Sequence, residues 1–129
     1  MMDNAQVTSA LLVVGFLQLK HFICDGPLQT LAMVKSKSIY GAPLGILHSA
    51  LHGLGTGLVF LIATFSPIVA IGLAVLDFTI HYHVDFTKEN IIKYFGWNTN
   101  NAQFWWALSA DQTIHQFTYL LLYVLAVKV

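Results

Sequence analysis

The sequence predicts an all-α integral membrane protein, a bundle of four transmembrane helices with a short interfacial helix between spans one and two. Of its 129 residues, 57% are hydrophobic and only 9% are charged, whereas soluble domains carry about 25% charged residues. One small core cannot hide that much apolar surface from water. Four apolar stretches of about the length of a membrane span, roughly 20 residues, follow one another, and we expect residues 1–129 to form a single domain.

The first two spans are expected over residues 7–25 and 44–65. Span one ends at the Asp-Gly-Pro cluster at 25–27, a combination that breaks helices. Residues 1–6 contain neither Lys nor Arg, so we expect span one to stay in the mature chain rather than be removed as a secretory signal. Between the two spans, residues 28–37 are predicted to form the short helix on the membrane surface.

The last two spans are expected over residues 67–95 and 110–127. Pro67 suits the first turn of span three. For span four, Ser109 and Gln112 have the spacing of a capping box. Three tryptophans come shortly before this span, where the aromatic belt of a membrane interface belongs.

The lysines indicate an orientation. One end of the predicted bundle carries five of them, namely Lys20, Lys35, Lys37, Lys88 and Lys93, and only Lys128 lies at the other end. By the positive-inside rule, the lysine-rich end is cytoplasmic. We therefore expect a multi-pass plasma-membrane protein with both termini outside the cytoplasm.

Histidine and aspartate recur four residues apart near the lysine-rich end of every predicted span. The pairs are His21 with Asp25, His48 with His52, His81 with Asp85, and Asp111 with His115. Residues four apart share a helix face, with Cβ atoms about 5–6 Å apart, so each pair presents two side chains to one point. In an up-and-down bundle these ends meet. All four pairs are therefore expected at one depth, at the cytoplasmic end.

Neutral imidazole and carboxylate are usual ligands of zinc, and also of non-haem iron or manganese. Helix bundles build such centres from inward-facing side chains on several helices. The four pairs supply more groups than one tetrahedral ion needs, so we expect one or two divalent transition-metal ions, zinc before iron or manganese. A zinc ion lowers the pKa of its bound water to about 7, which would supply hydroxide for hydrolysis at neutral pH.

Further polar residues are given supporting roles. Asp25 is expected to be a ligand or the general base, and Lys88 and Gln112 to steady an oxyanion or a ligand. Asp77 and Gln29 are expected to support the ligands by hydrogen bonds. Because a bare carboxylate at the depth of Asp77 would be costly, a partner such as the His81 ring is expected there.

Each group also has a purely structural interpretation. Asp25 could cap the helix that follows it, and Asp111 could complement a helix dipole. Asp85 and Lys88 are spaced as an ion pair, and the paired histidines of span two could be packing groups. Four pairs at one depth favour function, because ionisable groups near hydrocarbon are costly; the alternative is a hydrogen-bonded cluster that only locks the bundle.

We predict a metal-dependent hydrolase acting on a membrane-associated substrate. The alternative is a non-enzymatic membrane protein, either an accessory subunit of a larger complex or an ion or metal carrier. The far halves of the spans are almost wholly apolar, which disfavours a carrier. An oxygen-activating di-iron enzyme usually has a longer chain. Six lysines balanced by six acids exclude a nucleic-acid partner, so membrane lipid, a membrane-associated substrate or a partner subunit are the expected partners.

The order of these motifs resembles a bacterial and phage membrane family filed as domain of unknown function 3307. The resemblance spans nearly the whole chain and includes the motifs at residues 21–29 and 48–52. Its most specific parts are His-x-x-x-Asp-x-x-Lys at residues 81–88 and Asp-Gln-x-x-His at residues 111–115. It implies a small multi-span protein of the bacterial inner membrane and brings no established activity. The pairs are also loosely similar to those of small inner-membrane metal-dependent hydrolases, a likeness of pattern only.

Overall fold

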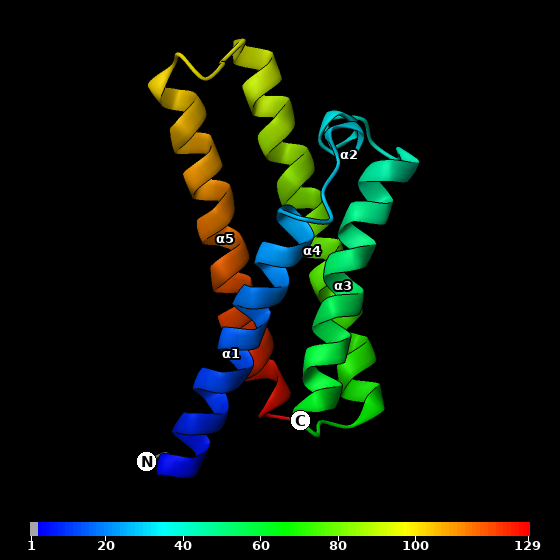
Figure 1. The fold of residues 1–129 in the computed structure, drawn as a ribbon, viewed down its shortest axis with the longest axis vertical. Helices are drawn as coiled ribbons and strands as arrows, with labels where there is room; N and C mark the ends of the chain where they lie inside the picture. Colours follow the sequence, from blue (N-terminus) through cyan, green and yellow to red (C-terminus); the bar gives the residue numbers. More distant parts are fainter. Residues whose placement is uncertain (1–2) are drawn as a thin grey trace.

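The computed structural model describes residues 3–129, and within that range every regular element is an α-helix. The helices are α1 (Asn4–Asp25), α2 (Leu31–Ser36), α3 (Pro43–Ile62), α4 (Pro67–Phe95) and α5 (Ala102–Ala126). The four long helices run alternately up and down, with both ends of the chain at one end of the bundle, and α2 lies toward the other end (Figure 1). The predicted all-α architecture, with a short helix after the first long one, is confirmed.

Among residues 3–129, three helices are long and apolar enough to cross a membrane, namely α1, α3 and α4. α5 is also long, with 25 residues. Its hydropathy is lowered by a polar run in its middle that includes Asp111, Gln112, His115 and Gln116. Three candidate spans are therefore shown, and the fourth span expected over residues 110–127 stays a prediction.

The ends of α3 and α4 are set by local backbone chemistry. A proline occupies the first turn of each helix, where its fixed φ is already helical. α3 ends at Ile62, three residues before the predicted end, because Thr64 takes a left-handed φ of 66° and turns the chain. α4 covers the predicted residues 67–95 and stops at Gly96, whose φ of 65° costs glycine little.

α5 begins eight residues before the predicted start at 110. The predicted capping box is wrong, because Ser109 and Gln112 both lie inside the helix. The turn before α5 is closed instead by Asn101, whose Oδ1 accepts from the backbone N–H of Asn98 at 2.9 Å. Two of the three tryptophans expected before span four therefore lie in the first turns of α5.

Asp25 does not cap the next helix. It is the last residue of α1. The cap of α2 is Thr30, whose side chain accepts from the backbone N–H of Met33. The carboxylate of Asp25 is therefore available to the bundle interior.

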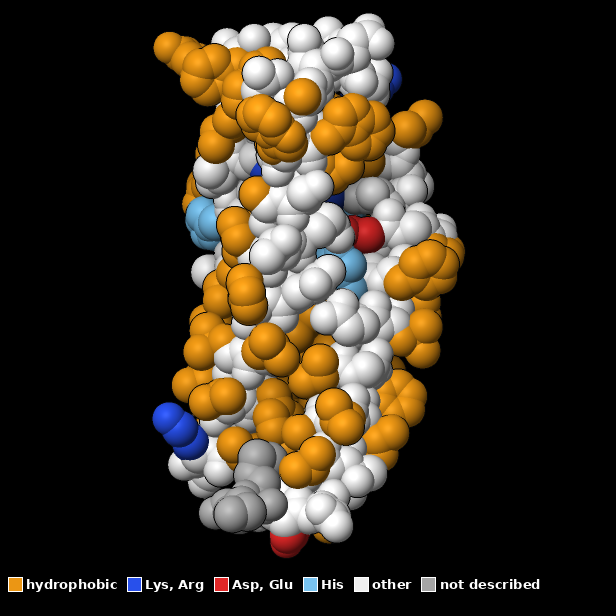
Figure 2. Space-filling view, turned by 90° about the vertical axis from the view of Figure 1, so that its left-hand side faces the viewer, with side chains coloured by type: hydrophobic (Ala, Val, Ile, Leu, Met, Phe, Trp, Pro, Cys, Tyr) orange, Lys and Arg blue, Asp and Glu red, His pale blue; other side chains and the backbone are white. Residues whose placement is uncertain are grey.

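The bundle has an apolar half and a polar half. The half near the chain termini has an aliphatic and aromatic core made of Val13, Leu17, Phe60, Ala70, Leu73, Tyr119, Leu122 and Ala126. In the other half the buried side chains are mostly ionisable. α3 lies directly on α4 at Gly53, where a Cβ would lie 2.7 Å from the carbonyl oxygen of Ala74. Hydrophobic side chains cover much of the outer surface in Figure 2, as a lipid-facing surface requires.

Candidate metal centre

Five histidines and three aspartates from the four long helices lie together inside the polar half of the bundle. They are His21 and Asp25 of α1, His48 and His52 of α3, His81 and Asp85 of α4, and Asp111 and His115 of α5. All of them except Asp25 are buried. The structure thus brings together the four pairs that helical spacing predicted, and their roles as ligands remain predictions.

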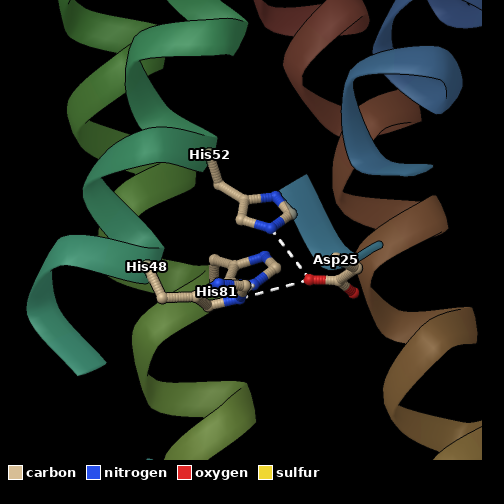
Figure 3. Close-up of side chains that lie close together, drawn as sticks. All are labelled: Asp25, His48, His52 and His81. Carbon is tan, nitrogen blue, oxygen red and sulfur yellow. Dashed lines mark hydrogen bonds and ion pairs between the residues drawn. The ribbon is translucent and has the colours of Figure 1, made fainter. Parts of the chain in front are cut away.

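One subset, which we name the Asp25 group, consists of Asp25, His48, His52 and His81. One ligand atom from each lies within 4.8 Å of the others, and Figure 3 shows the three rings and the carboxylate pointing toward one another. Asp25 Oδ1 is 2.9 Å from His52 Nε2 and 3.2 Å from His48 Nε2. His48 Nε2 is 3.3 Å from His81 Nε2. Three imidazole nitrogens and a carboxylate oxygen are a donor set that tetrahedral zinc accepts.

Hydrogen bonding alone leaves part of this group unsatisfied. The Nδ1 atoms of His48 and His81 are buried and have no hydrogen-bond partner among the described residues. A neutral imidazole has one donor and one acceptor nitrogen. Each of these two rings therefore leaves a buried polar atom unpaired, although nearly all buried polar atoms in proteins are paired. Because these are not the Nε2 atoms that contact Asp25 and one another, they stay unpaired whether or not a cation is bound there.

A second subset, the Asp85 group, consists of His81, Asp85 and His115. Asp85 Oδ2 is 3.3 Å from His81 Nε2, and Asp85 Oδ1 is 3.4 Å from His115 Nε2. The ring of His81 is stacked between those of His52 and His115, with centroids 3.6 and 4.0 Å away. His81 therefore belongs to both groups through the same nitrogen.

His21 and Asp111 lie beside these groups rather than within them. His21 Nδ1 is 2.6 Å from the hydroxyl of Tyr119, and its Nε2 is 2.8 Å from Gln112 Oε1 and 3.0 Å from Asp25 Oδ2. Both of its nitrogens thus have protein partners. Asp111 Oδ1 is 3.3 Å from His115 Nε2. In this arrangement His21 holds Asp25 in place, and Asp111 does the same for His115.

The predicted supporting residues have mixed positions. Gln112 Nε2 donates to Asp111 Oδ2 at 3.1 Å and to Asp25 Oδ2 at 3.4 Å, so it links the two carboxylates. Lys88 Nζ lies 2.7 Å from Glu89 and 3.8 Å from Asp111. Gln29 Nε2 donates to the main-chain carbonyl of Asp25 at 2.9 Å and so holds the end of α1.

Asp77 has a different partner from the expected His81 ring. Its Oδ2 accepts from Lys20 Nζ at 2.9 Å and from the hydroxyl of Thr56. Lys20 reaches this place because residue 55 is glycine: a Cβ there would lie 2.5 Å from Lys20 Cγ. A close approach between α1 and α3 thus decides the partner of Asp77.

Sequence reasoning missed four residues of this half of the bundle. Thr56 continues the stripe of His48 and His52 by one turn, and Tyr119 continues that of Asp111 and His115. The same spacing rule, carried one turn further, would have found both. Two lysines, Lys20 and Lys37, were interpreted only as markers of orientation, yet both are 7% exposed. For Lys20, its place inside an apolar span is a signal in itself, because a lysine there requires a buried partner.

Unlike Asp77 and Asp85, Asp25 has no ammonium group in contact with its carboxylate among the described residues. Asp77 has an ammonium partner in Lys20 at 2.9 Å, and Asp85 has one in Lys37 at 2.8 Å. Within the described residues, the charged or chargeable groups that contact Asp25 are three imidazoles. Its carboxylate is thus the one in this cluster that most needs a cation.

Asp25 is also the acidic member of the cluster closest to the surface. Its side chain is 19% exposed, compared with 4% for Asp85 and 2% for Asp111. Figure 2 shows an acidic and a histidine side chain reaching the surface part-way along the bundle, between hydrophobic side chains. Among these carboxylates, that of Asp25 is thus the one most open to the outside of the bundle.

Comparison with known proteins gives a family for this chain. No curated protein and no solved structure matches the chain. A family model described as protein of unknown function (DUF3307) matches residues 12–129, a range that contains all four helix pairs. Because the match covers nearly the whole chain, this protein belongs to the DUF3307 family.

Proposed function

We propose that this protein binds a divalent transition-metal ion, zinc before iron or manganese, in the Asp25 group, and that it is a metal-dependent hydrolase of a membrane-associated substrate. One observation carries the proposal: one ring nitrogen from each of three imidazoles and one oxygen of Asp25, the carboxylate that lacks an ammonium partner, lie within 4.8 Å of one another. A cation at this point would balance that charge and take up the lone pairs that face one another.

The donor set suits catalysis as well as binding. Catalytic zinc sites use three protein ligands and leave a fourth position for water or substrate. His48, His52 and His81 supply three ligands, all of them fully buried. An ion held there would supply hydroxide at neutral pH. Asp25 lies next to that fourth position and nearest the surface, so we assign it the role of general base.

The neighbours of Asp25 fix its orientation. His21 and Gln112 hold Oδ2, at 3.0 and 3.4 Å, which directs Oδ1 toward the rings of His48 and His52. A base must lie within hydrogen-bond reach of the proton that it takes, and the proposal is supported by Oδ1 lying 2.9 and 3.2 Å from two of the ring nitrogens that would hold the ion. Lys88 is proposed to steady Asp111 rather than an oxyanion at Asp25.

A membrane-associated substrate is supported by the outer surface of the bundle. A groove of about 310 Å³ runs between α4 and α5; its walls include Ile91 and Ile114, and it reaches Lys88 and Asp111. An alkyl chain fits such apolar walls. The proposal includes a plasma-membrane location with α5 as the fourth span, the lysine-rich end in the cytoplasm and lipid as the surrounding partner.

The proposal is tested first by metal content. Protein purified in mild detergent without chelator should hold one or two equivalents of a transition metal, and His48→Ala and His52→Ala should lower that content. His83→Ala is the matched control, because His83 is exposed and bonds Tyr40 and a backbone carbonyl outside the cluster. Wild-type protein without metal would favour the fold-locking alternative.

Hydrolysis is tested separately on the same samples. Amphiphilic ester, amide and phosphoester substrates should be screened with metal-loaded protein in detergent. Activity should disappear with chelator, return with zinc, and be lost in Asp25→Asn while the metal content stays near that of the wild type. A chain that binds metal and hydrolyses none of these substrates would favour the accessory-subunit alternative.

A further inference from the structure

Lys37 brings an ammonium group to the cluster, and it does so from the connection between α2 and α3 rather than from a long helix. It follows the last residue of α2, is 7% exposed, and places Nζ 2.8 Å from Asp85 Oδ2. Lysine is almost never fully buried unless it is paired. Lys37 therefore has a specific place at the Asp85 group.

The backbone around Lys37 is fastened on two sides. A Cβ at Gly45 of α3 would lie 3.4 Å from the carbonyl oxygen of Ser36 and 3.7 Å from Lys37 Cα, so the end of α2 rests directly on α3. On the other side, Asn90 of α4 donates to the carbonyl of Ser38 at 3.1 Å. The lysine is thus held at the cluster by its neighbours along the chain and not only by its own ion pair.

The position of Lys37 conflicts with a metal ion at the Asp85 group. An ion bound by Asp85 would lie about 2.0–2.2 Å from a carboxylate oxygen, next to an ammonium group 2.8 Å from Oδ2. Two cations so close repel each other strongly in a buried site. His81 belongs to both groups, and its Nε2 is 3.3 Å both from His48 Nε2 and from Asp85 Oδ2; one imidazole lone pair binds one ion.

We infer that the chain holds one metal ion, in the Asp25 group, and that the Lys37 ammonium takes the place of a second cation at Asp85. This inference rests on the metal site of the proposed function and adds the stoichiometry of that site. Lys37 supplies the positive charge that Asp85 needs, so a second divalent ion is excluded. Without Lys37, the oxygens of Asp85 and Asp111 and the ring of His115 become a second site for a divalent transition metal.

The test is metal stoichiometry after saturation with zinc and removal of free ion, measured by elemental analysis against protein concentration. Wild-type protein should hold one equivalent and Lys37→Met two. Lys35→Met is the matched control: Lys35 lies two residues earlier, in α2, but is exposed, so this variant should stay at one equivalent. Lys37→Arg keeps the charge and should also stay at one.

A second variant covers the case in which Lys37→Met does not fold, which circular dichroism would reveal. Lys37→Met combined with Asp85→Asn removes both charges of the pair and leaves no unpaired ion. It should hold one equivalent, because Asp85 is not a ligand of the resident ion. A double variant without metal would assign that ion to the Asp85 group and overturn the inference.

The outcomes separate this inference from the proposed function. Two equivalents in the wild type, or one equivalent in folded Lys37→Met, would overturn the inference and leave the metal site standing. No metal in any variant would overturn both.

Discussion

The buried ion pair of Lys20 and Asp77 permits a quantitative test of how the polar half of the bundle is held. Nζ lies 2.9 Å from Oδ2, and the two side chains are 6% and 1% exposed. Asp77→Asn keeps the shape of the side chain but removes the charge opposite the ammonium, which then has as acceptors the new amide oxygen, Tyr119 Oη at 3.1 Å and His52 Nδ1 at 3.5 Å. Breaking a buried pair by removing one partner costs about 3–5 kcal/mol. We expect the free energy of unfolding to fall by that amount.

The assay is a double-mutant cycle with Lys20→Met, followed by circular dichroism as the protein unfolds in mixed micelles of rising denaturing-detergent content. The combined variant has no unpaired charge, so its loss should be smaller than the sum of the single losses by about 2–3 kcal/mol. Lys128→Met is the control, because Lys128 is exposed at the far end of the bundle. Single losses that add within about 0.5 kcal/mol would refute the assignment of Lys20 as the partner of Asp77.

Three further predictions concern packing, topology and pH. Gly55→Ala should lower the free energy of unfolding by about 1–3 kcal/mol, because the new Cβ would lie 2.5 Å from Lys20 Cγ. Gly72→Ala is the control and should not lower it, because nothing lies within 4 Å of the new Cβ. Equal effects of the two substitutions would contradict this account of Lys20. A reporter active only outside the cytoplasm should work after Val129 and fail within residues 98–101, and the reverse pattern would contradict the orientation. Metal occupancy should fall below about pH 6, because imidazole ligands must lose their proton to bind; occupancy unchanged at pH 5 would argue against histidine ligands.

Helical periodicity was enough to find most of the candidate site. A spacing of four residues puts two side chains on one face, and the alternation of long helices brings the four faces together. His48 and His52 illustrate this, since both are fully buried beside Asp25 of another helix. Contacts between helices could not be predicted in this way. The partner of Asp77 depends on the missing Cβ of Gly55, and the place of Lys37 depends on how the connection after α1 folds back.

The helix bounds, too, were predicted correctly in some places and not in others. α4 was predicted correctly because a proline and a glycine mark its ends, at Pro67 and Gly96. α5 was predicted to start too late, because Ser109 and Gln112 have the spacing of a capping box while Gln112 in fact turns toward Asp25 and Asp111. Gln112, a polar side chain of the candidate site, was therefore mistaken for part of a helix cap.

The central claim, that imidazoles of three helix turns hold a metal ion beside Asp25, is tested most directly by X-ray absorption at the zinc edge of the loaded protein. The proposed site predicts three imidazole nitrogens at about 2.0–2.1 Å and one oxygen from bound water at about 2.0–2.2 Å, with one imidazole lost in His52→Ala. A sulfur neighbour, which only Cys24 and the methionines could supply, or a shell of oxygen atoms without imidazole, would contradict it.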